Sequence, residues 1–149
     1  VCLRYASDRE TALDLLQDGF VKVFTALDSY AGSGSFEGWM RKIFVNSALE
    51  HLRKTDILRE AVDLDNTAEL MHPDNSVISE MSAADLLQLV QELPPGFRTV
   101  FNLFAIEGYS HKEISEMLEI TESTSRSQFT RAKQLLQRKV KELDERYER

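Results

Sequence analysis

Cysteine, proline and glycine are scarce in this chain of 149 residues, which contains one, three and six of them. The single cysteine, Cys2, excludes an internal disulfide, and no cysteines and histidines show the paired spacing of a zinc site. We therefore expect no metal and no cofactor, in a reducing, cytoplasmic setting. With 42% hydrophobic and 29% charged residues, the composition is typical of a soluble, helix-rich protein.

Long hydrophobic runs are also missing. The longest apolar stretch, Val100 to Ile106, is interrupted by Asn102 and is far shorter than the roughly 20 residues that cross a bilayer. We expect the chain to make no membrane contact of its own. Because it begins at Val1 rather than at a methionine, we expect preceding residues to be missing and a first helix to be incomplete.

Acids outnumber bases, but the two are unevenly distributed. The formal net charge of −7 alone argues against a nucleic-acid partner. Residues 55–95 hold nine acids and one base, so the rest of the chain carries a net charge of +1. Residues 126–141 hold six bases and no acid. Since charge is screened over about 8 Å at physiological salt, DNA responds to this basic segment more than to the total. A solvated helix face explains the segment equally well.

Two segments of the N-terminal half have helical periodicity. From Ala12 to Tyr30, we expect one buried stripe made of Leu15, Leu16, Phe20, Val23, Phe24 and Leu27. The sequence Ala-Gly-Ser-Gly-Ser at residues 31–35 predicts a loop. A second helix is predicted from Phe36 to the basic pair at residues 53–54, with Trp39 mostly in the core.

Residues 55–82 lose this regularity and collect acids, which predicts a linker with a short helix near Ile57 to Val62. Beyond the linker, one helix is predicted over Ala83–Leu93, where two prolines follow it. Another is predicted over Phe97–Ile106 and is closed by Gly108.

The remaining residues have the pattern of a helix-turn-helix. Ser110 and Glu113 have the spacing of a capping box at the start of a helix that buries Ile114, Met117 and Leu118. After the turn at residues 119–121, Thr121 is the expected N-cap of a last helix that buries Phe129, Ala132, Leu136 and Val140. The fold class is therefore all-α: two small, separately folded helical domains, residues 1–54 and 83–149, joined by an acidic linker. Whether the domains pack on each other is left open.

The last helix has a polar face opposite its apolar stripe. At 100° per residue, one arc contains Arg126, Ser127, Thr130, Arg131 and Gln134. The N-terminal part of such a helix enters the major groove, where arginine grips a guanine edge or a phosphate. We therefore predict DNA binding by Arg126, Ser127, Thr130 and Arg131 of this arc, together with their neighbours Thr124 and Lys133. A helical hairpin with a charged outer face is the alternative interpretation.

Three segments of the C-terminal half resemble the promoter-binding domain of extracytoplasmic-function (ECF) RNA polymerase sigma factors, in the sigma-70 family. They are Leu93-Pro-Pro-Gly-Phe-Arg98, Gly108-Tyr-Ser-His-Lys-Glu-Ile114 and Ser123-Thr-Ser-Arg-Ser-Gln-Phe-Thr-Arg-Ala132. Residues 12–20 resemble the family's polymerase-binding helix. Phe36-Glu-Gly-Trp39, with Asn46 and Arg53, resembles the segment that handles the opened promoter. Both halves match in the family's order, so the resemblance covers nearly the whole chain.

The resemblance implies a sigma factor that binds core RNA polymerase and directs promoter recognition and melting. Residues 1–54 would be sigma region 2, and residues 83–149 would be sigma region 4 at the minus-thirty-five element. The polymerase contacts implied are the β flap and the β′ clamp helices, the latter through Asp14, Gln17, Asp18 and Lys22. At the minus-ten element, Asn46 would help to hold a flipped base and Trp39 would support the edge of the melted duplex. The candidate phosphate contacts are Arg41, Lys42, Arg53 and Lys54. An anti-sigma factor is implied as a further partner.

Two residues depart from the family's pattern. Many members have Gly in the turn and Val early in the recognition helix, where this chain has Glu119 and Ser125. We expect Glu119 to alter the turn geometry and Ser125 to weaken helix packing slightly.

Other functions are weighed against this one. An enzyme is not expected, because the sequence has no phosphate-cradling Gly loop and no nucleophile beside a base. His51, His72 and His111 are scattered, and we interpret each as a surface residue. A stand-alone helix-turn-helix regulator that does not bind polymerase stays an alternative, as does a protein-binding adaptor, although a regulator would not need residues 12–54 in this form.

Overall fold

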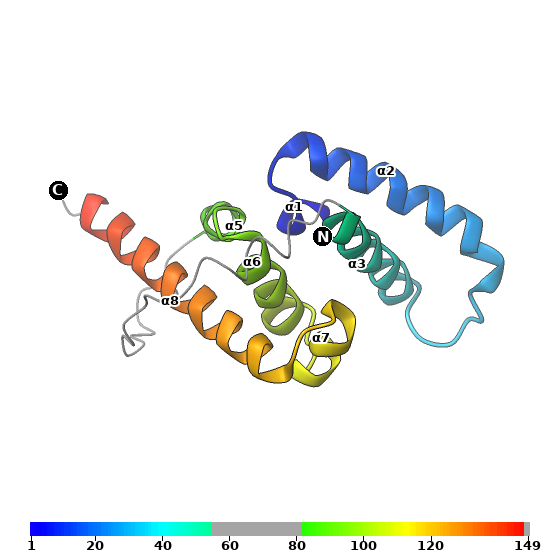
Figure 1. The fold of residues 1–149 in the computed structure, drawn as a ribbon. Helices are drawn as coiled ribbons and strands as arrows, with labels where there is room; N and C mark the ends of the chain where they lie inside the picture. Colours follow the sequence, from blue (N-terminus) through cyan, green and yellow to red (C-terminus); the bar gives the residue numbers. More distant parts are fainter. Residues whose placement is uncertain (55–81, 148–149) are drawn as a thin grey trace.

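The computed structural model describes residues 1–54 and 82–147, and every regular element in these two ranges is a helix (Figure 1). The N-terminal half contains α1 (Cys2–Tyr5), α2 (Arg9–Ala26), the 3-10 turn η1 (Leu27–Ser29) and α3 (Phe36–Lys54). The C-terminal half contains α5 (Ala83–Gln91), α6 (Pro95–Phe101), the π-helical turn η3 (Asn102–Ile106), α7 (His111–Leu118) and α8 (Glu122–Tyr147). The all-α prediction is confirmed. The predicted linker lies outside the described residues apart from Ser82, the N-cap of α5, so the short helix expected near residues 57–62 is not described.

Local capping sets where α2 and α3 begin. The Asp8 carboxylate accepts a hydrogen bond from the backbone N–H of Thr11 at 2.7 Å, so α2 starts three residues before the predicted Ala12. Ser35 does the same for α3, since its Oγ accepts from the N–H of Gly38 at 3.1 Å. The bounds of α3 agree with the prediction.

The packing of α2 on α3 differs from the predicted apolar stripe. Leu15 and Val23 are buried as expected, together with Ala12 and Gly19. The other predicted residues are partly exposed, with Phe24 the most exposed of them at 72%. The reason is a close approach at Gly19, where an added Cβ would lie 2.2 Å from Cε1 of Phe44 on α3. This contact shifts the buried line of α2 away from the side that holds Leu16, Phe20, Phe24 and Leu27.

In the C-terminal half, α5 and α6 pack against the long α8 (Figure 1). Their buried cluster consists of Leu89, Val90, Leu93, Phe97, Ala132, Leu136 and Val140. The helix predicted over Phe97–Ile106 is formed in two parts, α6 and η3, and Gly108 after them has a φ of +82°. The side chain of Arg98 is buried among these helices and donates to the carbonyl of Gln91 at 2.7 Å. This bond ties the start of α6 to the end of α5.

A second cluster joins the two halves through α1. Tyr5 and Ala6 are buried with Leu15, Val45, Ala48 and Leu49 of the N-terminal half and with Val100, Leu103 and Ile114 of the C-terminal half. Helix α1 contacts both α5 and α6, and it lies between the halves in Figure 1. The halves therefore pack on each other and share one hydrophobic cluster, a question that the sequence left open.

Candidate nucleic-acid interface

The predicted helix-turn-helix is formed by α7, a short turn and α8. The capping box at its start is complete: the Ser110 hydroxyl accepts from the N–H of Glu113, and the Glu113 carboxylate accepts from the N–H of Ser110 at 2.8 Å. Ile114, on the inner face of α7, is fully buried. At the far side of the turn, the Thr121 hydroxyl accepts from the N–H of Thr124 at 3.0 Å, which confirms Thr121 as the N-cap of α8. Both helix starts are thus held by side-chain caps.

The turn depends on a left-handed residue. Glu119 has φ 56° and ψ 41°, and it is the one non-glycine residue with a positive φ within residues 1–54 and 82–147. Glycine adopts this conformation without steric cost, whereas a residue with a Cβ does not. Glu119 therefore follows the path that a glycine would take, and its effect on the turn is a cost in stability.

Ser125, the second residue that departs from the family's pattern, joins α8 to α7 through a polar contact. Ser125 is 0% exposed, and its hydroxyl lies 2.9 Å from Nδ1 of His111. The imidazole of His111 stacks on Phe104 with ring centroids 4.3 Å apart and meets the edge of Phe129. Burial and the nearby Arg126 lower the pKa of His111 below its usual value. His111 is thus a half-buried residue that packs at the junction of α7 and α8.

The polar arc of α8 that is predicted to bind DNA is exposed at the N-terminal end of the helix. Arg126, Ser127 and Thr130 are exposed, and Arg131 is half-buried. The Arg126 guanidinium is held by the Glu122 carboxylate one turn earlier at 2.7 Å. Glu122 was not singled out from the sequence, although its spacing of four residues from Arg126 is that of a helical ion pair.

The other two predicted contacts lie beside this arc. Thr124 is half-buried, and its hydroxyl lies 2.8 Å from that of Thr121. Lys133 is exposed, and its Nζ lies 5.2 Å from the ring centroid of Phe129. All six predicted contacts therefore lie in the N-terminal half of α8.

The loop before α3 contains two glycines with positive φ and lies beside a cluster of three aromatic rings. Gly32 and Gly34 have φ values of +72° and +82°. The Tyr30 hydroxyl donates to the carbonyl of Gly34 at 2.8 Å. The Tyr30 ring lies 5.3 Å from both Phe36 and Trp39, so Trp39 is half-buried in this cluster. The cluster lies at the same end of α3 as the loop, and Tyr30 was not singled out from the sequence.

The remaining candidates on α3 lie along the helix. Asn46 and Lys42 are exposed, and Lys54 pairs with Glu50 at 2.8 Å. Two of the predicted phosphate contacts are exposed and also meet the C-terminal half. Arg41 approaches Glu107, and Arg53 donates to the carbonyl of Met117.

The polar residues predicted to meet polymerase share the outer face of α2. All four of them are exposed: Asp14, Gln17, Asp18 and Lys22. Lys22 pairs with Glu50 on α3 at 2.5 Å. Hydrogen bonds from Lys22 and Lys54 lower the pKa of Glu50 to about 2. This link between α2 and α3 joins two surfaces that the sequence analysis treated separately.

The described ranges contain neither a metal site nor a membrane-spanning helix. No group of three or more His, Cys, Asp or Glu residues there could hold a metal ion. None of the helices in residues 1–54 and 82–147 combines the length and the apolar character that a membrane crossing needs.

Comparison with known proteins matches both halves to one family. Residues 1–57 match Sigma-70 region 2, and residues 83–136 match Sigma-70, region 4. The chain is 27% identical to the RNA polymerase sigma-H factor of Pseudomonas aeruginosa, covering 95% of this chain and 79% of that protein. It is 28% identical to the ECF RNA polymerase sigma-E factor of Escherichia coli strain K12, covering 87% of this chain and 74% of that protein.

A solved structure has the same fold. It is the co-crystal structure of the sigma factor RpoE in complex with the anti-sigma factor NepR from Bartonella quintana, and it covers 96% of this chain and 88% of that chain. The TM-score is 0.57 at 20% sequence identity. Because regions 2 and 4 match in order along one chain, and the helix-turn-helix lies within the matched region 4, the protein is an ECF sigma factor of the sigma-70 family, a DNA-binding factor for transcription initiation.

Proposed function

We propose that the N-terminal end of α8 reads the minus-thirty-five element as duplex DNA. The observation that carries this proposal is the capped helix-turn-helix with Arg126, Ser127 and Thr130 exposed on its leading turns. An α-helix fits the major groove, where arginine donates two hydrogen bonds to a guanine. Arg131 and Lys133 follow one turn later, and Thr124 lies at the helix start, so we assign these three to the same contact.

We assign capture of the opened minus-ten strand to the glycine loop and α3. Asn46 and Trp39 would hold and support an unstacked base, while Lys42 and Lys54 would contact phosphates with Arg41 and Arg53. Extruding a base costs a few kcal/mol, and each melted step forfeits about 1.4 kcal/mol of stacking, so the captured strand must offset both. We propose no catalytic role for the chain, because nucleotide addition belongs to the polymerase.

Polymerase contact is assigned to the outer face of α2 through Asp14, Gln17, Asp18 and Lys22, which would meet the β′ clamp helices. The C-terminal half would lie at the β flap. We propose residues 1–54 and 83–149 as the two functional domains and residues 55–82 as the linker that lets one chain span both promoter elements. An anti-sigma factor is proposed as a further partner, since the structural relative is bound to one. Because core polymerase and promoter DNA would be its partners, we propose that the protein acts in the cytoplasm.

Run-off transcription with core polymerase tests the proposal. On a library of promoter sequences, the wild-type chain should give promoter-dependent product. A folded chain that gives none would contradict the proposal.

Substitutions separate the two assigned surfaces. Arg126→Ala should weaken duplex binding by about 5- to 150-fold if the side chain contacts a base edge, which corresponds to about 1–3 kcal/mol. Arg138→Ala, an exposed arginine three turns further along α8, is the matched control and should change binding little. Asp14→Ala and Gln17→Ala should impair polymerase binding and spare DNA affinity. Equal loss of both activities in every variant would contradict these roles.

A further inference from the structure

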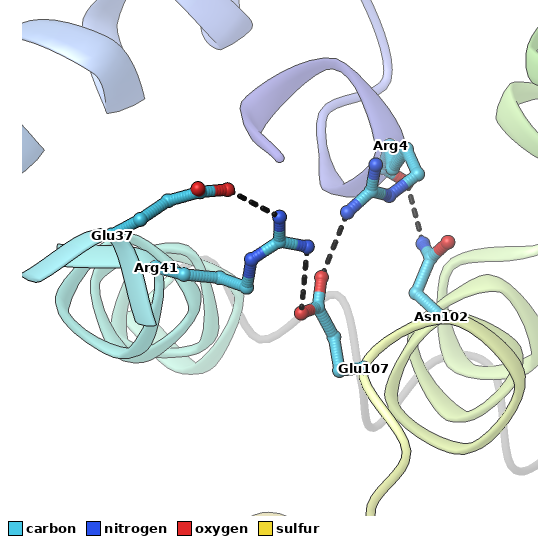
Figure 2. Close-up of polar contacts among 5 residues, drawn as sticks. All are labelled: Arg4, Glu37, Arg41, Asn102 and Glu107. Carbon is cyan, nitrogen blue, oxygen red and sulfur yellow. Dashed lines mark hydrogen bonds and ion pairs between the residues drawn. The ribbon is translucent and has the colours of Figure 1, made fainter. Parts of the chain in front are cut away.

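A buried carboxylate lies between two arginines where the halves of the protein meet. The side chain of Glu107, just after η3, is 3% exposed. Its Oε1 accepts from Nη2 of Arg4 on α1 at 2.8 Å, and its Oε2 lies 3.7 Å from Nη1 of Arg41 on α3 (Figure 2). Asn102 supports this arrangement by donating to the carbonyl of Arg4 at 2.7 Å. The two cations come from the N-terminal half and the anion from the C-terminal half.

The two arginines have the properties of a phosphate site. Guanidinium groups bind carboxylate and phosphate with the same fork of donors, so one anion can replace the other. The Nε of Arg4 is buried and has no hydrogen-bond partner in the structure. The pair therefore offers a donor that the two oxygens of Glu107 leave unused, which an anion with more acceptor oxygens could engage.

The position of the pair points to the DNA backbone. Arg41 lies on α3, the helix assigned to the minus-ten strand, and Arg53 on the same helix is also held by the C-terminal half through the carbonyl of Met117. The Glu107 side chain is 3% exposed, whereas those of Arg4 and Arg41 are 23% and 44% exposed. A phosphate can therefore approach Arg41 from solvent, but it can take the place of Glu107 between the two arginines only when the halves separate.

We propose that Arg4 and Arg41 form a phosphate-binding site for promoter DNA, and that Glu107 occupies this site as an internal competitor when the halves are packed together. The inference rests on the proposed function, which places α3 against the promoter. The apparent DNA affinity is then the affinity of the separated form multiplied by the fraction of chains in which the halves are separated. Arg4 becomes a DNA-contact residue, and Glu107 becomes the residue that restricts access to it.

Removing the charge of Glu107 tests the proposal. A backbone contact does not depend on sequence, so the probe is a fluorescent forked DNA of arbitrary sequence, titrated with the full chain by anisotropy. Glu107→Gln keeps the side-chain length and should tighten binding about tenfold, a change of about 1.4 kcal/mol. The dependence of log affinity on log salt should become steeper by about one for each phosphate gained.

Two further variants identify the cause of any gain. Glu10→Gln makes the same charge change on the exposed first turn of α2 and should alter affinity less than twofold. The double variant Glu107→Gln with Arg41→Ala should lose the gain, and so should Glu107→Gln with Arg4→Ala. Circular dichroism checks that each variant is folded. If Glu107→Gln does not fold, Glu107→Asp keeps the charge and withdraws it from Arg41, and it should give a smaller gain in the same direction.

Affinity of Glu107→Gln equal to that of Glu10→Gln would overturn the inference, and so would a gain that survives the loss of Arg41. For a folded Glu107→Asp, unchanged DNA binding would overturn it as well. Run-off transcription by the wild type separates this failure from that of the proposed function. Promoter-dependent product from the wild type, together with no effect at Glu107, contradicts the phosphate site alone. Absence of product contradicts the proposed function itself.

Discussion

Replacing Glu119 by glycine should stabilise the protein. Glu119 holds a left-handed conformation at the end of α7, and its side chain is exposed. A residue with a Cβ pays about 1–2 kcal/mol for this conformation, whereas glycine does not. Since the hydrogen bonds to the carbonyl of Ser115 come from the backbone N–H groups of Glu119 and Ile120, the substitution removes none of them.

The expected gain is smaller than the relieved strain. Glycine raises the conformational entropy of the unfolded chain, which costs about 0.4–1 kcal/mol. The free energy of unfolding of Glu119→Gly should therefore rise by about 0.5–1 kcal/mol. For a chain of this size, a gain of 1 kcal/mol corresponds to an increase in Tm of about 2–4 °C.

Urea unfolding followed by circular dichroism measures the change. Glu116→Gly is the matched control, because it makes the same substitution at an exposed position inside α7. There, glycine should lower the free energy of unfolding by about 1 kcal/mol. The two variants should thus shift the urea midpoint in opposite directions. A lower midpoint for Glu119→Gly, or equal losses in both variants, would refute the strain that we assign to the turn.

Other substitutions test packing and titration. Gly19→Ala should lower the free energy of unfolding by about 1–3 kcal/mol, because its Cβ would meet the Phe44 ring. Gly38→Ala should raise it by about 0.5–1 kcal/mol, since the added Cβ would lie 3.8 Å from the Ser35 side chain, an ordinary contact. Thermal melts of this pair should show opposite shifts. Ser125→Ala should cost about 1 kcal/mol in urea unfolding through loss of the bond to His111. Because the folded pKa of His111 is lowered, the unfolded chain binds a proton first, so stability should fall as the pH drops below about 6.5, its ordinary pKa, and level off below the folded pKa. Unfolding of His111→Gln across this range should lack that contribution, and an unchanged pH profile would contradict it.

Features that depend on neighbouring residues could be predicted from the sequence. The capping box at Ser110, the N-cap at Thr121 and the left-handed Gly108 all follow from residues within one helical turn. The bounds of α3 were predicted for the same reason, since its start and end carry local signals. The start of α2 was misplaced because Asp8, whose carboxylate caps it, was not considered as an N-cap.

Features that depend on packing between distant segments could not be predicted. Periodicity placed six apolar residues of α2 on one stripe, but the close approach of Phe44 to Gly19 decides which of them are buried. Likewise, no pattern near Glu107 indicates that its partners lie in α1 and α3. The phosphate contacts at Arg41 and Arg53 were predicted from their charge and their place in the segment that resembles the family, and the structure shows that the other half of the chain contacts both.

The shared hydrophobic cluster bears on how the halves could separate. Tyr5, Val100, Leu103 and Ile114 are all 0% exposed, and Tyr5 belongs to the N-terminal half while the other three belong to the C-terminal half. Separation would expose part of this apolar surface to water, at about 25 cal/mol for each Å². Phosphate contacts at Arg4 and Arg41 offset only the ionic part of that cost. A partner that also covers apolar surface would shift the equilibrium further than DNA alone, so binding of polymerase and binding of promoter DNA should each strengthen the other.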